Sequence, residues 1–192
     1  MASNFTEFEL GKYQGREGAH LLVVGCGNPM AGDDSAGVEI VRRLRGRRNC
    51  ACQLSTTPNA GIDLLDGSPA ADVILFVDAV SSGAPPGALH LVPLPSQDIE
   101  PRMLSSVSSH GWGLAETLEL ARALGRTLPR LFLLGVEVSG VEPGAPRSPA
   151  VEHAIAFVVD QFPRMCSALV DSESALWHSA HHFLPGDNSF PQ

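Results

Sequence analysis

A short apolar run that passes into a glycine loop and a pair of aspartates is the feature that most constrains this chain. Residues 21–26 read Leu-Leu-Val-Val-Gly-Cys, which is typical of a buried strand, and residues 27–32 include Gly, Asn and Pro, which favour a loop. Asp33 and Asp34 follow, and either can cap a predicted helix that runs to about Leu44. Open α/β sheets present their chemistry at the carboxyl ends of their strands, so this segment predicts an active site.

The rest of the chain alternates predicted strands with predicted helices. The apolar residues at 73–77 suit a central strand covered on both faces, and we expect this strand to end at Asp78. Apolar positions at 151–162 recur at helical spacing and predict an amphipathic helix. Weaker patterns predict strands near 50–55, 88–94 and 131–138, and helices around 64–65 and 114–121. The alternation predicts an α/β fold: a three-layer α/β/α sandwich with a mainly parallel central sheet, similar to hydrolase and phosphorylase folds.

Length and composition indicate a single domain. The 192 residues, of which 44% are hydrophobic and 18% charged, can bury a substantial core but are few for two domains. We expect a loose N-terminal segment at 1–18, one domain at 19–170 and an irregular tail at 171–192. We also expect a monomer.

Charge and cysteine usage exclude several classes of protein. A net charge of −8 argues against a nucleic-acid surface, and the basic cluster at 42–48 is interpreted as a solvated helix end. The sequence has no secretory start and no apolar span of about 18 residues. Its four cysteines, at 26, 50, 52 and 166, show no CxxC spacing. We therefore expect a reduced, cytoplasmic protein without membrane insertion.

Three ionisable residues are expected to meet at one edge of the sheet. Asp34 follows the first strand, Asp78 ends a central strand, and His110 precedes a predicted helix. Two carboxylates and an imidazole can hold a divalent transition metal or orient a water molecule. Each residue also has an ordinary structural interpretation: a helix cap for Asp34, a turn for Asp78 and a loop position for His110.

These residues stand within five short motifs that occur in order over residues 20–170: Gly-Cys-Gly-Asn at 25–28, Asp-Asp-Ser-Ala-Gly-Val at 33–38, Val-Asp-Ala-Val at 77–80, Ser-His-Gly-Trp-Gly-Leu at 109–114 and Leu-Gly-Val-Glu at 134–137. In order and spacing they resemble the maturation endopeptidases of nickel-iron hydrogenases. The resemblance implies a peptidase that removes a short C-terminal extension from the hydrogenase large-subunit precursor after nickel has been inserted.

The same resemblance implies roles for the three residues. By motif position, Asp34, Asp78 and His110 would contact the metal and carry the catalysis. The nickel belongs to the precursor and serves as a recognition signal, so no permanent cofactor is expected. Either the docked nickel or the two aspartates would polarise the scissile carbonyl or activate water, with His110 orienting the metal.

Other interpretations stay open. A non-catalytic, nickel-sensing accessory protein would bind the large subunit without cutting it. A nucleotide-binding domain fits poorly, because the loop at 25–30 lacks the third fingerprint glycine and two aspartates stand where a phosphate would bind. Neither an HExxH pair nor a Gly-x-Ser-x-Gly elbow occurs, and a mechanism through Cys26 is a minor alternative.

Two segments add further expectations. Many members of the family carry an Asp-Gly-Gly-Thr-like turn after the second strand, where this chain has Ser-Thr-Thr-Pro-Asn-Ala-Gly at 55–61, which leaves the choice of precursor open. The tail histidines His178, His181 and His182 could bind a metal ion if they lay on a helix, or could simply be solvated. Trp112 could anchor its loop or pack over a substrate peptide.

Overall fold

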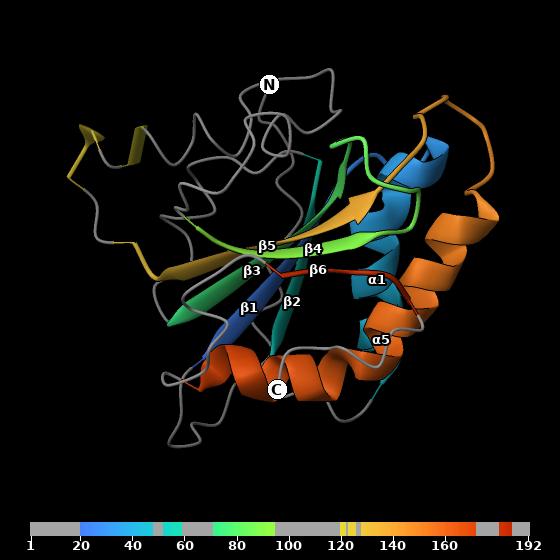
Figure 1. The fold of residues 1–192 in the computed structure, drawn as a ribbon. Helices are drawn as coiled ribbons and strands as arrows, with labels where there is room; N and C mark the ends of the chain where they lie inside the picture. The colour runs from blue at the N-terminus through green and yellow to red at the C-terminus, as the bar shows by residue number, and fades with distance from the viewer. Residues whose placement is uncertain are drawn as a thin grey trace.

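The computed structural model describes residues 20–47, 52–58, 71–94, 120–121, 123–125, 128–171 and 181–185. Over these residues the chain forms a six-stranded sheet in the order β2-β1-β3-β5-β4-β6 (Figure 1). The strands are β1 Leu21–Cys26, β2 Gln53–Thr57, β3 Val73–Val80, β4 Leu89–Leu94, β5 Arg130–Glu137 and β6 His181–Phe183. The pairs β2–β1, β1–β3 and β3–β5 are parallel, and β4 runs antiparallel to both of its neighbours. The predicted α/β fold with a mainly parallel sheet is confirmed.

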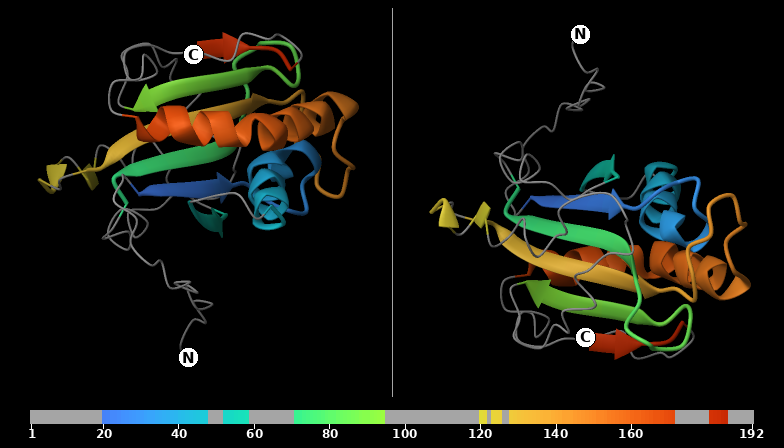
Figure 2. Two further views of the ribbon diagram at one scale, coloured as in Figure 1. Left: turned by 90° about the horizontal axis from the view of Figure 1, so that it is seen from below. Right: turned by 90° about the horizontal axis from the view of Figure 1, so that it is seen from above.

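Two helices cover one face of this sheet. Helix α1, Ala36–Arg45, follows the short 3-10 helix η1, Gly32–Ser35, and helix α5 spans Pro149–Val170. Both lie on the same side of the strands (Figure 2). Their apolar stripes, with Ile40 and Phe162 among them, form one buried cluster with strand residues such as Leu75. None of the helices in the described ranges is long and apolar enough to cross a membrane.

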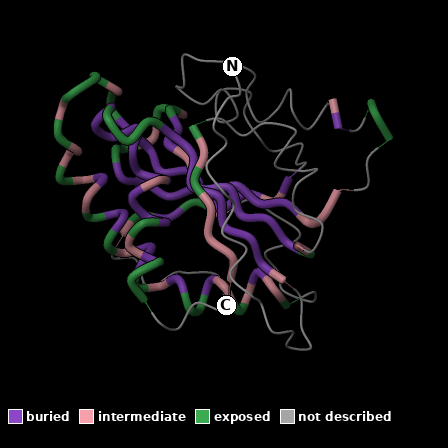
Figure 3. The backbone as a smooth tube through the Cα atoms, turned by 180° about the vertical axis from the view of Figure 1, so that it is seen from behind, coloured by how far each residue is buried: buried purple, intermediate pink, exposed green. Residues whose placement is uncertain are grey.

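A second apolar cluster lines the opposite face of the sheet. It contains Leu22, Ile74, Phe76 and Leu133, each no more than 2% exposed. The burial of both faces explains why the central strands are continuous apolar runs, and Figure 3 shows them as the buried centre of the molecule. The helices predicted around 64–65 and 114–121, which would form the third layer, lie wholly or mostly outside the described residues.

Three sequence-based boundaries differ from the structure. β3 does not end at Asp78 but continues to Val80, because its last three residues pair with β5. The first helix does not begin at Asp33 or Asp34 but at Ala36, after η1. His181–Phe183, within the tail expected to be irregular, forms an edge strand that pairs with β4. The domain limits themselves stay a prediction.

One cysteine also departs from expectation. Cys52 is disulfide-bonded, whereas Cys26 and Cys166 are free thiols. The prediction of a fully reduced chain was therefore wrong at Cys52. It rested on the absence of CxxC spacing, which does not exclude other pairings.

Candidate functional site

Asp34 and Asp78 lie at the carboxyl ends of two adjacent parallel strands, β1 and β3. The pairing between β1 and β3 ends at Gly25 and Val77, so Asp78 is the first β3 residue beyond it. Asp34 lies in η1, directly after the loop that leaves β1, and is 5% exposed. Because the carboxyl ends of neighbouring parallel strands meet at one edge of a sheet, the two side chains reach the same region.

The loop between β1 and η1 is folded around the Asp34 carboxylate. The backbone N–H of Asn28 donates to Asp34 Oδ2 at 2.8 Å, and Asn28 Oδ1 accepts from the backbone N of Met30 at 2.9 Å. Gly27 has a φ of 115°, and a Cβ there would collide with the carbonyl oxygen of Asp34. The glycine at this position is therefore required by both the backbone conformation and the close approach of η1.

Asp78 has an unusual acidity for an aspartate. The pKa of Asp78 is raised to about 7, mainly because the carboxylate is poorly solvated and, to a lesser degree, because the negative charge of Asp34 is near. The hydrogen bond that Oδ1 accepts from the N–H of Ala79 at 2.9 Å acts in the opposite direction and lowers the pKa. Near neutral pH the Asp78 carboxyl is thus about half protonated. By solvent exposure Asp78 is only half-buried, so it stays accessible. A carboxyl that holds a proton beside a second carboxylate can act as an acid, a base or a cation ligand.

The thiol of Cys26, which lies near Asp78, is not activated as a nucleophile. Cys26 ends β1 and is 3% exposed, and both burial and, to a lesser degree, the charge of Asp78 raise the pKa of its thiol well above its usual range. Since the thiolate is the nucleophilic form, this environment disfavours a cysteine mechanism at neutral pH.

Glycine lets the first helix approach the strand ends closely. A Cβ at Gly37 would collide with the carbonyl oxygen of Val77 and lie 2.5 Å from that of Cys26. The start of α1 therefore packs directly on the backbone of β1 and β3 just before Asp78. This contact fixes η1, with Asp34, against the strand that carries Asp78.

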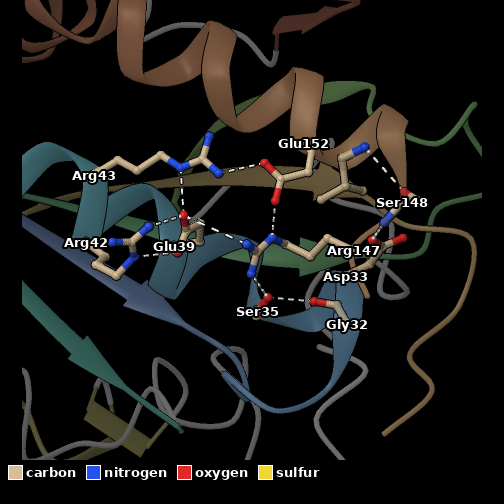
Figure 4. A network of polar contacts seen from close by, with 10 residues as sticks. Gly32, Asp33, Ser35, Glu39, Arg42, Arg43, Arg147, Ser148 and Glu152 are labelled. Carbon is tan, nitrogen blue, oxygen red and sulfur yellow. Dashed lines mark hydrogen bonds and ion pairs between the residues drawn. The ribbon is translucent and has the colours of Figure 1, made fainter. Parts of the chain in front are cut away.

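The residues on either side of Asp34 are bound to the segment that precedes α5. Asp33 Oδ1 accepts a 2.6 Å hydrogen bond from the backbone N of Ser148, and Arg147 Nη1 donates to Ser35 Oγ at 3.0 Å (Figure 4). Neither η1 nor α1 has a side-chain cap. The prediction that Asp33 or Asp34 caps the helix was wrong, because both carboxylates accept from other backbone groups instead.

A network of ion pairs backs this arrangement (Figure 4). Glu39 of α1, whose side chain is 8% exposed, accepts from Arg42 at 2.6 and 2.7 Å and from Arg43 at 2.6 Å. Arg43 and Arg147 each donate to Glu152 of α5 at 2.6 Å. The hydrogen bond from Arg42, helped by those from Arg43 and the charge of Arg147, outweighs burial and lowers the pKa of Glu39 to about 2. The arginines predicted as a solvated helix end are thus partly engaged in joining α1 to α5.

A second buried polar cluster lies on β4, β5 and β6, and the sequence did not reveal it. Glu137 is 1% exposed and accepts from Ser82 Oγ at 2.8 Å and from the backbone N of Ser82 and Gly83 at 2.8 and 2.9 Å. His90 Nε2 lies 3.1 Å from Glu137 Oε2, and His90 Nδ1 lies 2.7 Å from His182 Nδ1. The sequence offered only weak signals for it: Glu137 ends the apolar run of β5, and His90 is a single ionisable residue within the apolar β4.

Part of the predicted site falls outside the described ranges. His110 and Trp112 are among the residues that the structure does not describe, so the expected convergence of His110 with the two aspartates stays a prediction. The described residues contain no cluster of three or more His, Cys, Asp or Glu side chains suited to a metal ion. His181 and His182 lie on β6, so the helix on which a metal site of the tail histidines would depend is not present there.

Comparisons with known proteins agree on one family. A family model described as hydrogenase maturation protease matches residues 55–164, more than half of the chain. The chain is 30% identical over 144 residues to the hydrogenase 2 maturation protease of Escherichia coli strain K12, covering 73% of this chain and 87% of that protein. It is 36% identical over 126 residues to the hydrogenase expression/formation protein HupD of Thiocapsa roseopersicina, covering 64% of this chain but only 56% of that protein.

A solved structure with related sequence has the same fold. The hydrogenase maturating endopeptidase HybD from E. coli superposes with a TM-score of 0.56 at 27% identity, covering 74% of this chain and 89% of that one. The fold of the sheet therefore belongs to an architecture that is already known.

Proposed function

Because this chain belongs to the hydrogenase maturation protease family, we propose that it is an endopeptidase that removes the C-terminal extension of a nickel-iron hydrogenase large-subunit precursor after nickel insertion. The expected family, a peptidase family, is confirmed. The specific reaction, its dependence on nickel in the precursor, and action as a monomer in the cytoplasm are parts of the proposal.

The observation that carries the proposal is the electrostatic pairing of Asp34 and Asp78. The Asp34 carboxyl is buried, the nearby Asp78 carboxyl is half-buried with a pKa of about 7, and no ion pair in the described part of the chain brings a positive charge to either. A divalent nickel ion presented by the precursor would supply that charge and displace the proton of Asp78. A precursor without nickel would leave the two carboxyls unpaired, so the site would discriminate by a difference of affinities.

Peptide hydrolysis would follow from the same geometry. With nickel docked on Asp34 and Asp78, and with His110 as a nitrogen ligand, a water molecule between the carboxylates and the scissile carbonyl would be polarised for attack. The water adds to the carbonyl carbon, the C–N bond breaks, and the released amine takes the proton. Asp78 can carry a proton through this sequence because its pKa lies near neutrality.

The test is cleavage of a precursor, followed by intact-protein mass spectrometry. The purified protein should remove a C-terminal peptide from nickel-loaded precursor and leave the nickel-free precursor intact. Asp34→Asn and Asp78→Asn should lower the rate by at least about 100-fold. Asp160→Asn, on an aspartate whose side chain is 70% exposed on α5, is the matched control and should keep the wild-type rate.

The outcomes separate the proposal from its rival. Full cleavage activity in both Asp34→Asn and Asp78→Asn would remove these residues from the mechanism. Binding of the loaded precursor without any change in its mass would favour the accessory protein instead. His110→Ala then tests the third predicted ligand in the same assay.

A further inference from the structure

We propose that Arg147 is a positioning residue for Asp34, holding the η1 turn so that the Asp34 carboxylate faces Asp78. The expected effect on kcat rests on the proposed function, whereas the expected effect on the position of Asp34 does not. Arg147 touches neither aspartate in the contacts described above. Its action would be through the backbone of the turn that carries Asp34.

Asp34 lies between two anchored neighbours. Asp33 is tied to the backbone N of Ser148 at 2.6 Å, and Ser35 accepts from Arg147 Nη1 at 3.0 Å while donating to the carbonyl of Gly32 at 2.6 Å. Both outside anchors come from residues 147 and 148, more than 110 positions along the chain. Asp33 and Ser35, which flank Asp34 in the sequence, are therefore both hydrogen-bonded to the segment leading into α5 (Figure 4).

Arg147 can serve as a clamp because it is itself fixed. Its Nε donates to Glu152 Oε1 of α5 at 2.6 Å, and its Nη2 lies 3.9 Å from Glu39 Oε1 of α1. Together with the bond to Ser35, three nitrogens of one planar guanidinium reach three separate elements, η1, α1 and α5. A lysine ammonium on a flexible stem cannot reproduce this fork geometry.

The chain offers a matched control in Arg42. Arg42 makes two hydrogen bonds to the same Glu39, at 2.6 and 2.7 Å, but it makes no described contact with η1. Replacing Arg42 therefore removes the same kind of charge from the same acidic partner. Only the replacement of Arg147 also removes the hydrogen bond to Ser35 Oγ in η1.

The hydrogen bond from Asn28 N to Asp34 Oδ2 gives a local reporter of carboxylate position. In Arg147→Met, hydrogen exchange of the Asn28 amide, measured by NMR, should become at least about fivefold faster, whereas Arg42→Met should leave it unchanged. Glu39 and Glu152 keep Arg43 as a partner in both variants, so the fold is expected to persist.

The kinetic readout uses the nickel-loaded precursor. For Arg147→Met, kcat should fall by about tenfold with KM within about twofold, because misplacement of a catalytic group affects the chemical step more than docking. Arg147→Lys should lie between wild type and Arg147→Met. Ser35→Ala, which removes the acceptor of Arg147 without touching any ion pair, should lower kcat as well and covers the case in which Arg147→Met does not fold.

Each result decides the inference. Unchanged Asn28 exchange in Arg147→Met, or equal effects of Arg147→Met and Arg42→Met, would overturn it. So would faster exchange with an undiminished kcat. If the wild-type protein does not cleave the precursor, the proposed function fails, while the exchange measurement still decides whether Arg147 positions Asp34.

Discussion

The Asp78→Asn substitution removes an ionisable group whose protonation the fold strongly perturbs. Asparagine keeps the size of the side chain and an Oδ1 that can accept the 2.9 Å hydrogen bond from Ala79 N. The substitution therefore isolates the cost of ionising Asp78 in the folded protein. Because burial and the charge of Asp34 raise the pKa of Asp78 from 3.8 to about 7, the folded state binds more protons than the unfolded chain between these values.

The sign and size of the effect follow from this difference in protonation. Stability must fall as the pH rises through the window from 3.8 to about 7, and the loss is complete above it. The ionisation of Asp78 costs about 2 kcal/mol of unfolding free energy at pH 5 and about 4 kcal/mol at pH 8. Relative to wild type, Asp78→Asn should therefore gain about 2–3 kcal/mol more stability at pH 8 than at pH 5.

Urea denaturation of both proteins at the two pH values measures this difference directly. Asp160→Asn serves as the control, because Asp160 is exposed and its only described ion pair, to Arg47, spans 3.8 Å. That variant should stay within about 0.5 kcal/mol of wild type. If Asp78→Asn raises the free energy of unfolding by the same amount at pH 5 and at pH 8, Asp78 does not hold a proton in the folded protein at pH 5 and the reasoning is refuted.

Three further changes test the supporting framework, each by denaturant unfolding. Gly37→Ala should lower the free energy of unfolding by about 2–4 kcal/mol, because the new methyl group meets the backbone carbonyl of Val77. Gly46→Ala, whose methyl group would lie 3.4 Å from the carbonyl oxygen of Arg43, should cost less than about 1 kcal/mol. Equal effects of the two substitutions would contradict this packing. Glu39→Gln should cost about 2 kcal/mol at pH 7, and the difference should vanish as the pH falls from 4.5 to about 2, where the wild-type carboxylate is protonated. Burial and the charge of His182 lower the pKa of His90 below 6.5, so the wild-type protein should lose stability as the pH falls below that value. His90→Gln should reduce this loss. The same pH dependence of stability in both proteins would contradict this role of His90.

The strands and their relation to the site could be predicted because they depend on local sequence. A strand covered on both faces must be apolar along its length, and the runs at 21–26, 73–77 and 131–138 are. Asp34 and Asp78 could be placed at one sheet edge because both follow or terminate apolar runs of parallel strands. The end of β3 was misplaced by two residues, since Ala79 and Val80 belong to the strand only through pairing with β5.

The features that sequence reasoning missed depend on partners far along the chain. Asp33 reads locally as a helix cap, yet its carboxylate binds Ser148, 115 positions away. The β6 strand has only three residues, too few to show a period, and it is held by pairing with β4 and by the contact between His90 and His182. No local pattern could reveal either arrangement.

The distribution of charge around α1 explains how one small region can hold both a fully ionised and a half-protonated carboxylate. Arg42, Arg43 and Arg147 gather on Glu39 and hold its pKa near 2, whereas no ion pair in the described part of the chain reaches Asp34 or Asp78. An arginine beside Asp78 would lower its pKa and occupy the place of a cation. The arginines instead form ion pairs that join α1 to α5, and none of these ion pairs neutralises Asp34 or Asp78. If the proposed function holds, a nickel ion delivered by the precursor would supply the positive charge that the two aspartates lack, and the arginine network would favour this recognition by leaving their site free.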